Sequence, residues 1–355
     1  MTDIQKEKRA VAIWLFAVAA MVMIMAIIGA ITRLTESGLS IAEWQPIRGA
    51  LPPTNAADWA QVFDIYKTSP QYLLVNHGMS LPEFKNIFWW EWAHREWGRL
   101  IGIVFAAGAI WFWARGAVKR IGNNLGKNLI AILILGLLQG VMGWLMVASG
   151  LVHEPAVSHY RLAAHLLLAV ALYVSCLWVA LEVRGGKLEK MQPPTSNLQS
   201  LYKHSIAALG MVIITLIWGA FTAGLRAGVL YNTWPLMNGH WTPDNFWIIQ
   251  PWWKNYFENH GVVQYVHRTL AYITSLMCIS IGLVTWRRKV PQPTARWGYA
   301  VAAMGFVQPA LGIATVLTQV DLHPAVTHQA GAFVLIGLLV IWITQLRSLR
   351  TDRRP

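Results

Sequence analysis

Four histidines lie within long apolar stretches of the sequence: His94, His165, His267 and His328. Each half of the chain contributes two, and the apolar runs predict that they lie on alternate helices. An ionisable side chain at membrane depth is costly and usually faces a cavity, a partner or a cofactor. Two opposing imidazoles in a helix bundle suit the axial positions of a heme iron, whereas zinc prefers three or four ligands, often with Cys or carboxylate. The pattern favours heme iron over a proton relay or a purely structural role.

Glu91 lies three residues before His94, on the same face of the predicted helix. A carboxylate beside a heme edge could take a proton or orient a substrate. The matching position of the second half holds Gln264. We therefore expect the first half to perform chemistry and the second half to hold a resident cofactor. The alternative is that Glu91 only pairs with Arg95 at an interface.

Arginines accompany the histidines near one predicted face of the membrane. A guanidinium binds carboxylates in a forked geometry, so heme propionates are one expected partner and interfacial anchoring is the other. This expectation concerns Arg95, Arg99, Arg161 and Arg268.

The first-half ligand is ambiguous. An ungapped alignment from Pro155 and Pro324 makes His159, rather than His165, the counterpart of His328. The two candidates differ by six residues, about 9 Å along a helix. His165 lies deeper and is the predicted ligand. Whether His94 and His165 bind iron at the same time stays open.

The composition is that of a membrane protein. Of 355 residues, 55% are hydrophobic and 13% charged, against roughly a quarter charged in soluble proteins. The net charge of +13 comes from short basic clusters between apolar runs, so no nucleic-acid partner is expected. Spanning helices need about 20 apolar residues. The predicted spans are Val11–Ile31, Phe88–Trp113, Asn128–Ala148, Val157–Leu181, Ser205–Gly224, Gly261–Trp286, Trp297–Leu317 and Val326–Gln345.

Basic residues fall in every second connection, which places both termini in the cytoplasm by the positive-inside rule. The N-terminus shows no cleavable signal, so a bacterial inner membrane with surrounding lipid is the expected location. The outward loops Thr32–Ile87 and Leu225–His260 are long and show no obvious secondary structure. Such loops are usually functional, and we expect the histidine sites to lie toward this outer face.

The two halves of the sequence resemble each other. Gly29-Ala30-x-Thr32 recurs as Gly219-Ala220-x-Thr222, and Gln139 with Gly143 recurs as Gln308 with Gly312. Gly38, Trp44 and Gly49 also recur, as Gly228, Trp234 and Gly239. The ordered matches predict an all-α membrane protein of two duplicated four-helix bundles, related by a pseudo-two-fold axis along the membrane normal. The expected units are residues 1–185 with the outward loop 32–87, a cytoplasmic linker 186–204, and residues 205–355.

At these residues the chain resembles the heme A synthase family over nearly its whole length. The resemblance is carried by an ordered set of segments rather than by any one. They are Thr32-Arg-Leu-Thr-Glu-Ser-Gly-Leu-Ser40, Glu91-Trp-Ala-His94-Arg95, Arg161-Leu-Ala-Ala-His165, Tyr231-Asn-Thr-Trp-Pro-Leu-Met237, Val263-Gln-Tyr-Val-His267-Arg268 and His328-Gln329.

The resemblance implies oxidation of the C8 methyl group of heme O to the formyl group of heme A, by successive hydroxylations, for use in cytochrome c oxidase. It implies a resident heme b between His267 and His328 and a substrate site near His94 and His165, with Glu91 assisting. Heme O synthase would supply the substrate, and oxidase assembly factors are expected partners by analogy. The electron partner and the oligomeric state, including a homo-oligomer, stay open.

The first outward loop has no cysteine pair, so the chain resembles the cysteine-free branch of the family, typical of proteobacteria and mitochondria; Cys176 and Cys278 both lie in apolar runs. Two other functions remain as alternatives. A di-heme cytochrome b linked to quinone would use the same four histidines, and a transporter built from duplicated bundles would contain no heme.

Overall fold

The structure, a computed structural model, describes residues 2–41, 48–149, 157–185 and 196–349. Within these ranges, eight helices are long and apolar enough to cross a membrane, which confirms the predicted all-α, multi-pass class. They are α1 (Asp3–Leu34), α4 (Leu81–Ala114), α6 (Asn123–Ser149), α7 (His159–Gly185), α8 (Ser196–Gly224), α10 (His260–Arg287), α11 (Ala295–Leu317) and α12 (Leu322–Ser348).

The helices extend beyond the apolar runs that predicted them. For example, α4 begins at Leu81 rather than at Phe88. Ser80 and Glu83 form a capping box, in which the Glu83 carboxylate accepts hydrogen bonds from the Ser80 backbone N–H and hydroxyl at 2.8 and 2.7 Å. A polar first turn can therefore continue a membrane helix outside the lipid.

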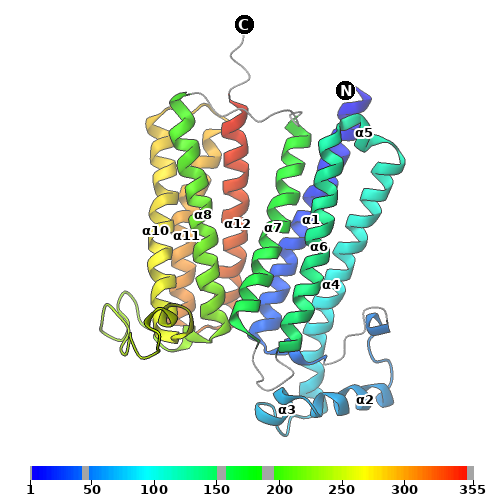
Figure 1. The fold of residues 1–355 in the computed structure, drawn as a ribbon, viewed down its shortest axis with the longest axis vertical. Coiled ribbons are helices and arrows are strands. Elements are labelled where there is room, and N and C mark those ends of the chain that lie inside the picture. Colours follow the sequence, from blue (N-terminus) through cyan, green and yellow to red (C-terminus); the bar gives the residue numbers. More distant parts are fainter. Residues whose placement is uncertain (1, 42–47, 150–156, 186–195, 350–355) are drawn as a thin grey trace.

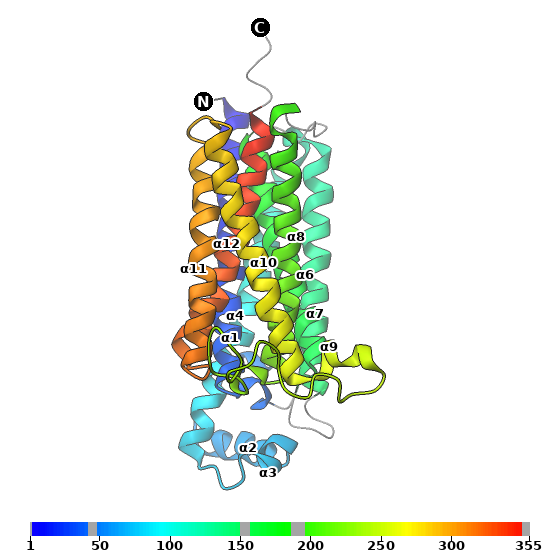
Figure 2. The same ribbon diagram turned by 90° about the vertical axis from the view of Figure 1, so that its left-hand side faces the viewer.

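The long helices run side by side and form two groups (Figures 1 and 2). The first group contains α1, α4, α6 and α7, and the second contains α8, α10, α11 and α12. The start of α1 and the end of α12 lie at the same end of the molecule, hereafter the terminal end. The connecting segments that follow α1 and α8 lie at the opposite end, hereafter the loop end.

The two groups meet along a central interface. Helix α7 packs against α8 and α12, and α1 packs against α12. A two-fold axis between the groups would relate α1 to α8 and α7 to α12. It would then turn the α1–α12 contact into the α8–α7 contact, and both contacts are present. Tyr173 and Phe333 pack edge to face at the centre, with ring centroids 5.5 Å apart. Cys176 and Cys278 are buried free thiols on α7 and α10.

The first connection at the loop end is more ordered than the sequence predicted. The expectation of no secondary structure was wrong, because α2 (Ala56–Lys67) and α3 (Pro70–Leu74) follow the short turns η1 (Ser37–Leu39) and η2 (Arg48–Ala50). Asn55 and Ser69 cap the two helices by accepting backbone hydrogen bonds. An aromatic cluster joins them to the start of α4 and comprises Trp59, Tyr66, Phe84 and Phe88.

The second connection contains η3 (Ala227–Val229), η4 (Trp252–Lys254) and the single turn α9 (Asn255–Glu258). At the terminal end, α5 (Ala117–Ile121) joins α4 to α6. Trp44, Pro155 and residues 186–195 of the predicted linker lie outside the described ranges.

Candidate functional site

Each of the four histidines lies against a glycine of a neighbouring helix. A Cβ atom added to Gly29 of α1 would lie 3.3 Å from Nε2 of His94, and one added to Gly219 of α8 would lie 2.9 Å from Cε1 of His267. The same holds for Gly143 of α6 beside His165, at 3.2 Å, and for Gly312 of α11 beside His328, at 3.0 Å. All four imidazoles therefore approach a helix backbone so closely that a larger residue in place of the glycine would require the ring to shift.

In the second group the two imidazoles face each other. The ring centroids of His267 and His328 are 6.4 Å apart, with an angle of 81° between the ring planes. Nδ1 of His267 lies 3.1 Å from the backbone oxygen of Thr215. A hydrogen bond donated there would fix the tautomer that leaves the Nε2 lone pair free. Nδ1 of His328 lies 3.3 Å from the amide nitrogen of Gln308.

The first group repeats this arrangement with differences. The amide nitrogen of Gln139 lies 3.3 Å from Nε2 of His165, whereas that of Gln308 lies 3.3 Å from the other ring nitrogen, Nδ1, of His328. Nδ1 of His165 and the Oε1 atoms of both glutamines are buried and have no hydrogen-bond partner among the described residues. Within the described part of the chain, a ring contact joins His267 to His328 but not His94 to His165. The rings of the first pair are therefore not packed against each other as those of the second pair are.

The structure favours His165 over His159 as the counterpart of His328. His165 is the seventh residue of α7, and His328 is the seventh residue of α12. His159 instead lies at the start of α7 and packs against Phe221, with ring centroids 5.4 Å apart. The connection before α7 is longer than the one before α12, so an alignment counted from the prolines shifts the register.

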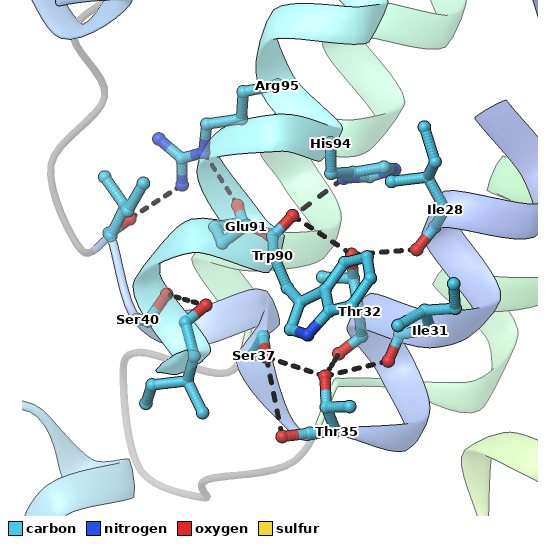
Figure 3. Close-up of polar contacts among 12 residues, drawn as sticks. Ile28, Ile31, Thr32, Thr35, Ser37, Ser40, Trp90, Glu91, His94 and Arg95 are labelled. Atoms are coloured by element: carbon cyan, nitrogen blue, oxygen red, sulfur yellow. Dashed lines mark hydrogen bonds and ion pairs between the residues drawn. The ribbon is translucent and has the colours of Figure 1, made fainter. Parts of the chain in front are cut away.

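Glu91 is buried between Arg95 and His94 (Figure 3). Its Oε1 atom lies 2.7 Å from Nε of Arg95, and its Oε2 atom lies 4.0 Å from Nδ1 of His94. Arg95 also donates to the backbone oxygen of Ile41, at 2.7 Å. The Glu91–Arg95 pair therefore exists, and it holds one carboxylate oxygen while the other lies on the side of His94.

The second group replaces this ion pair by an amide. Gln264 and Arg268 both donate to the backbone oxygen of Tyr231, at 3.2 and 2.6 Å. Arg268 donates further to the oxygen of Thr233, at 3.0 Å. Arg95 and Arg268 thus both tie a loop-end segment to the helix that bears the histidine. These backbone contacts leave the predicted role toward heme propionates as an expectation.

The remaining polar residues of the prediction are dispersed. Arg99 pairs with Glu96 on α4, and Arg161 donates to the backbone oxygen of Leu145 at 2.6 Å. His204 is half-buried, and its Nε2 atom lies 2.7 Å from the hydroxyl of Ser280. It therefore takes part in the packing between α8 and α10.

The glycines and glutamines are the functional candidates that reasoning from residue chemistry passed over. Gly29, Gly143, Gln139 and their counterparts appeared in the sequence only as repeat markers. The signal was present, because in both halves each recurs in the same order, on the long helix that precedes a histidine-bearing helix. Their contacts with the imidazoles explain why these residue types occur in both.

The second pair of histidines fits a heme iron. Iron–imidazole bonds of about 2 Å place two opposing rings about 6 Å apart between centroids, which agrees with the 6.4 Å observed. The adjacent glycine makes room beside each ring, and Nδ1 of His267 faces the backbone oxygen of Thr215, an acceptor of the kind that metal-binding histidines have as outer partner. In the first pair, the unpartnered Nδ1 atom of His165 is likewise suited to a ligand.

Comparison with known proteins gives a consistent result. The family model described as "Cytochrome oxidase assembly protein" matches residues 12–340. The chain is similar to a protein named "Heme A synthase" from Rhodospirillum centenum, 48% identical over 346 residues, which cover 98% of this chain and 91% of that protein. It is also similar to proteins of the same name from Parvibaculum lavamentivorans (45% identical; 95% and 94% covered) and Nitrosospira multiformis (44%; 95% and 93%).

Proposed function

Because this chain belongs to the cytochrome oxidase assembly protein family, we propose that it is a heme A synthase, a membrane enzyme that converts heme O into heme A. The observation that carries the proposal is the similarity, over 98% of the chain and at 48% identity, to a protein of that name. The two pairs of glycine-flanked histidines support it, because an enzyme that handles hemes needs such ligands.

The reaction that we propose is oxidation of the C8 methyl group of heme O to a formyl group by successive hydroxylations. A heme held by the second group, between His267 and His328, would supply one-electron chemistry at a potential set by its axial ligands and their hydrogen bonds. We assign this resident heme as heme b. The 6.4 Å ring separation supports this division of the chain, with units 1–185 and 205–355.

The substrate heme O is assigned to the first group, near His94 and His165. Glu91 is the proposed proton acceptor. Arg95 engages its Oε1 atom and thereby orients Oε2 toward the side of His94. Gln264, at the corresponding place, has no proton to exchange in this way, which supports chemistry in the first group only.

The expected location is the bacterial inner membrane, with both termini in the cytoplasm and the histidines toward the outer face. Basic residues gather at the terminal end, which supports this orientation. They include Lys6, Arg9, Lys119, Arg120, Arg287, Arg288, Lys289 and Arg347. Membrane lipid, a heme O synthase, an electron partner and oxidase assembly factors are the partners that this location would provide.

The proposal is tested by extracting the hemes from purified protein and separating them with mass detection. We expect heme b together with heme O or heme A in the wild type. Glu91→Gln copies the second group, so it should accumulate heme O and lower heme A formation about a hundredfold. His267→Ala should lose mainly heme b.

The matched control is Glu182→Gln, since Glu182 is another carboxylate on a membrane helix and contacts Trp178 instead. It should leave the heme composition unchanged. Wild-type levels of heme A in Glu91→Gln would contradict the role of this carboxylate. Two heme b groups per chain with neither heme O nor heme A would favour a di-heme cytochrome b.

A further inference from the structure

The packing of the two groups differs at one place, the seam between the second and third long helices. In the second group, α10 and α11 pack closely along their length, whereas the corresponding α4 and α6 of the first group are in contact at few positions. Figure 1 shows α4 leaning away from α6 toward the terminal end. The two seams thus lie between equivalent pairs of helices, but the helices of the second seam are closely packed and those of the first are not.

The glycines of the seams show this difference at the level of atoms. Gly305 of α11 lies three residues before Gln308, and its added Cβ would lie 3.0 Å from Ile279 and 3.1 Å from Cys278 on α10. Its counterpart Gly136 lies three residues before Gln139 and has no atom within 4 Å of the same position. Gly102 of α4 and Gly140 of α6 also face open space.

The open stretch has defined ends. Toward the terminal end it is closed by Trp113 and Val118, which lie 3.8 and 3.4 Å from an added Cβ at Gly126 of α6. Toward the loop end it reaches the level of His94 and His165. Gly102 follows His94 by eight residues, about 12 Å along the helix, so the opening runs from the histidines into the middle of the membrane.

Both seams border the lipid. Large apolar residues with high exposed fractions line both seams. They are Ile103 (64% exposed) and Leu137 (64%), which follow Gly102 and Gly136 in the first group, and Leu276 (67%) and Phe306 (63%) at the corresponding positions of the second. An exposed apolar surface at this depth faces acyl chains. Beside these exposed apolar residues, the glycines of the first seam face open space, whereas Gly305 of the second seam is packed against α10.

We propose that the α4–α6 seam holds the isoprenoid tail of the substrate heme and admits this heme laterally from the bilayer. This inference rests on the proposed function. In a heme with a long apolar tail, the iron of the planar macrocycle would be bound by the histidine pair, and the tail would lie in apolar surroundings. The loosely packed α4–α6 seam offers such surroundings beside the first pair. A resident heme without a tail needs no opening, which agrees with the closed α10–α11 seam.

The inference is tested with Gly136→Leu and Gly102→Leu, singly and together. Leu favours helix more than Gly does, and neither position has a neighbour within 4 Å, so the helices should form normally. The control is Gly210→Leu on α8, which also faces open space but lies outside the seam. Each protein, in lipid nanodiscs, is incubated with heme O or with tail-free heme b, and the bound hemes are extracted and counted.

We expect the filled seam to weaken retention of heme O roughly tenfold to a hundredfold, as overpacking of an occupied space does. Binding of tail-free heme and the spectrum of the His267–His328 site should stay unchanged, and Gly210→Leu should behave as wild type. Equal retention of heme O in the seam variants, or equal loss of both hemes, would overturn the inference.

The outcome for the wild type separates this inference from the proposed function. If the wild type makes heme A and the double variant Gly136→Leu with Gly102→Leu still retains heme O normally, only the seam proposal is refuted. The seam is then occupied by lipid acyl chains. If the wild type neither binds heme O nor forms heme A, the proposed function is refuted. The seam proposal, which rests on that function, is then refuted as well.

Discussion

At the scale of single residues, the imidazoles of His94, His165, His267 and His328 share one kind of neighbour. A glycine on the adjacent helix lets each ring lie against backbone, and the clearance differs from site to site. The closest is Gly219, where an added Cβ would lie 2.9 Å from His267, against 3.3 Å for Gly29 beside His94. A contact below 3.0 Å forces atoms to move, whereas the wider one is relieved by a small shift.

We therefore expect Gly219→Ala to displace His267 and to weaken binding of the proposed heme b by about 1–3 kcal/mol. Gly29→Ala should have a smaller effect at His94. The measurement is the heme b content and the absorbance spectrum of each purified variant, with Gly210→Ala as a control in open space. Full heme b content in Gly219→Ala would show that the close approach is not required.

The site was predictable from sequence to the extent that it depended on residue type. His94, His267 and His328 follow from their depth in apolar runs, and Glu91 from its spacing to His94. Depth alone favoured His165 over His159, and the helix register supports that choice, because the connections before α7 and α12 differ in length. The Glu91–Arg95 contact is local, with the two residues four positions apart on one helix, and the sequence left it open only because Arg95 had a second expected partner.

At the scale of elements, α2 and α3 form a small layer at the loop end, and Tyr66 lies at its centre. The Tyr66 hydroxyl donates to Gln71 Oε1 at 3.2 Å and accepts from Asn76 at 2.8 Å. Gln71 donates in turn to the backbone oxygen of Glu36, at 2.8 Å. This chain of hydrogen bonds ties both helices to the turn that follows α1.

Burial raises the pKa of the Tyr66 phenol above its ordinary value of 10.0. Below pH 10 the folded and unfolded chains both keep the phenol neutral. Above it the unfolded phenol ionises first, so the stability of this layer should fall as pH rises. Tyr66→Phe should remove that pH dependence and cost about 1 kcal/mol at neutral pH.

Hydrogen exchange of residues 56–79 at pH 7 and above pH 10 provides the measurement. Tyr72→Phe is the matched control, because Tyr72 packs its ring against Tyr66 in the same cluster. Identical exchange in Tyr66→Phe and wild type at both pH values would exclude this role of the hydroxyl.

The eight long helices were predictable because membrane spans require long apolar runs, which leave a strong signal. The sequence signal for the start of α4 and for the whole of α2 and α3 was weaker. Ser80 with Glu83, Asn55, and Ser69 before Pro70 are helix-start signals. They were masked by the polar composition of the loop. Their packing on Phe84 and Phe88 stabilises helices that are too short to form alone.

At the scale of the whole molecule, two contacts join equivalent positions of the two groups. Glu36 and Arg226 lie seven residues after Gly29 and Gly219, and both adopt a left-handed backbone with φ of 56° and 52°. Their side chains pair at 2.6 Å. Arg33 donates to the backbone oxygen of Ala223, its own counterpart, at 3.0 Å. The repeat was visible in the sequence, but these contacts and the unequal seams depend on how the groups pack.

We expect Glu36→Arg to weaken the union of the two groups, because it places two cations together, and the double variant with Arg226→Glu to recover most of the loss. The side chains are partly exposed, so the coupling should be below about 1 kcal/mol. Thermal unfolding in detergent measures it through a double-mutant cycle. A double variant no more stable than the sum of the single changes would exclude a direct interaction.

The Glu36–Arg226 pair also bears on descent. On a true two-fold axis a residue meets its own copy, so a symmetric dimer of one ancestral bundle would have set two glutamates, or two arginines, against each other at this point. Opposite charges became possible only after the two copies could mutate independently. A present-day half expressed alone should therefore not regain this contact by pairing with itself.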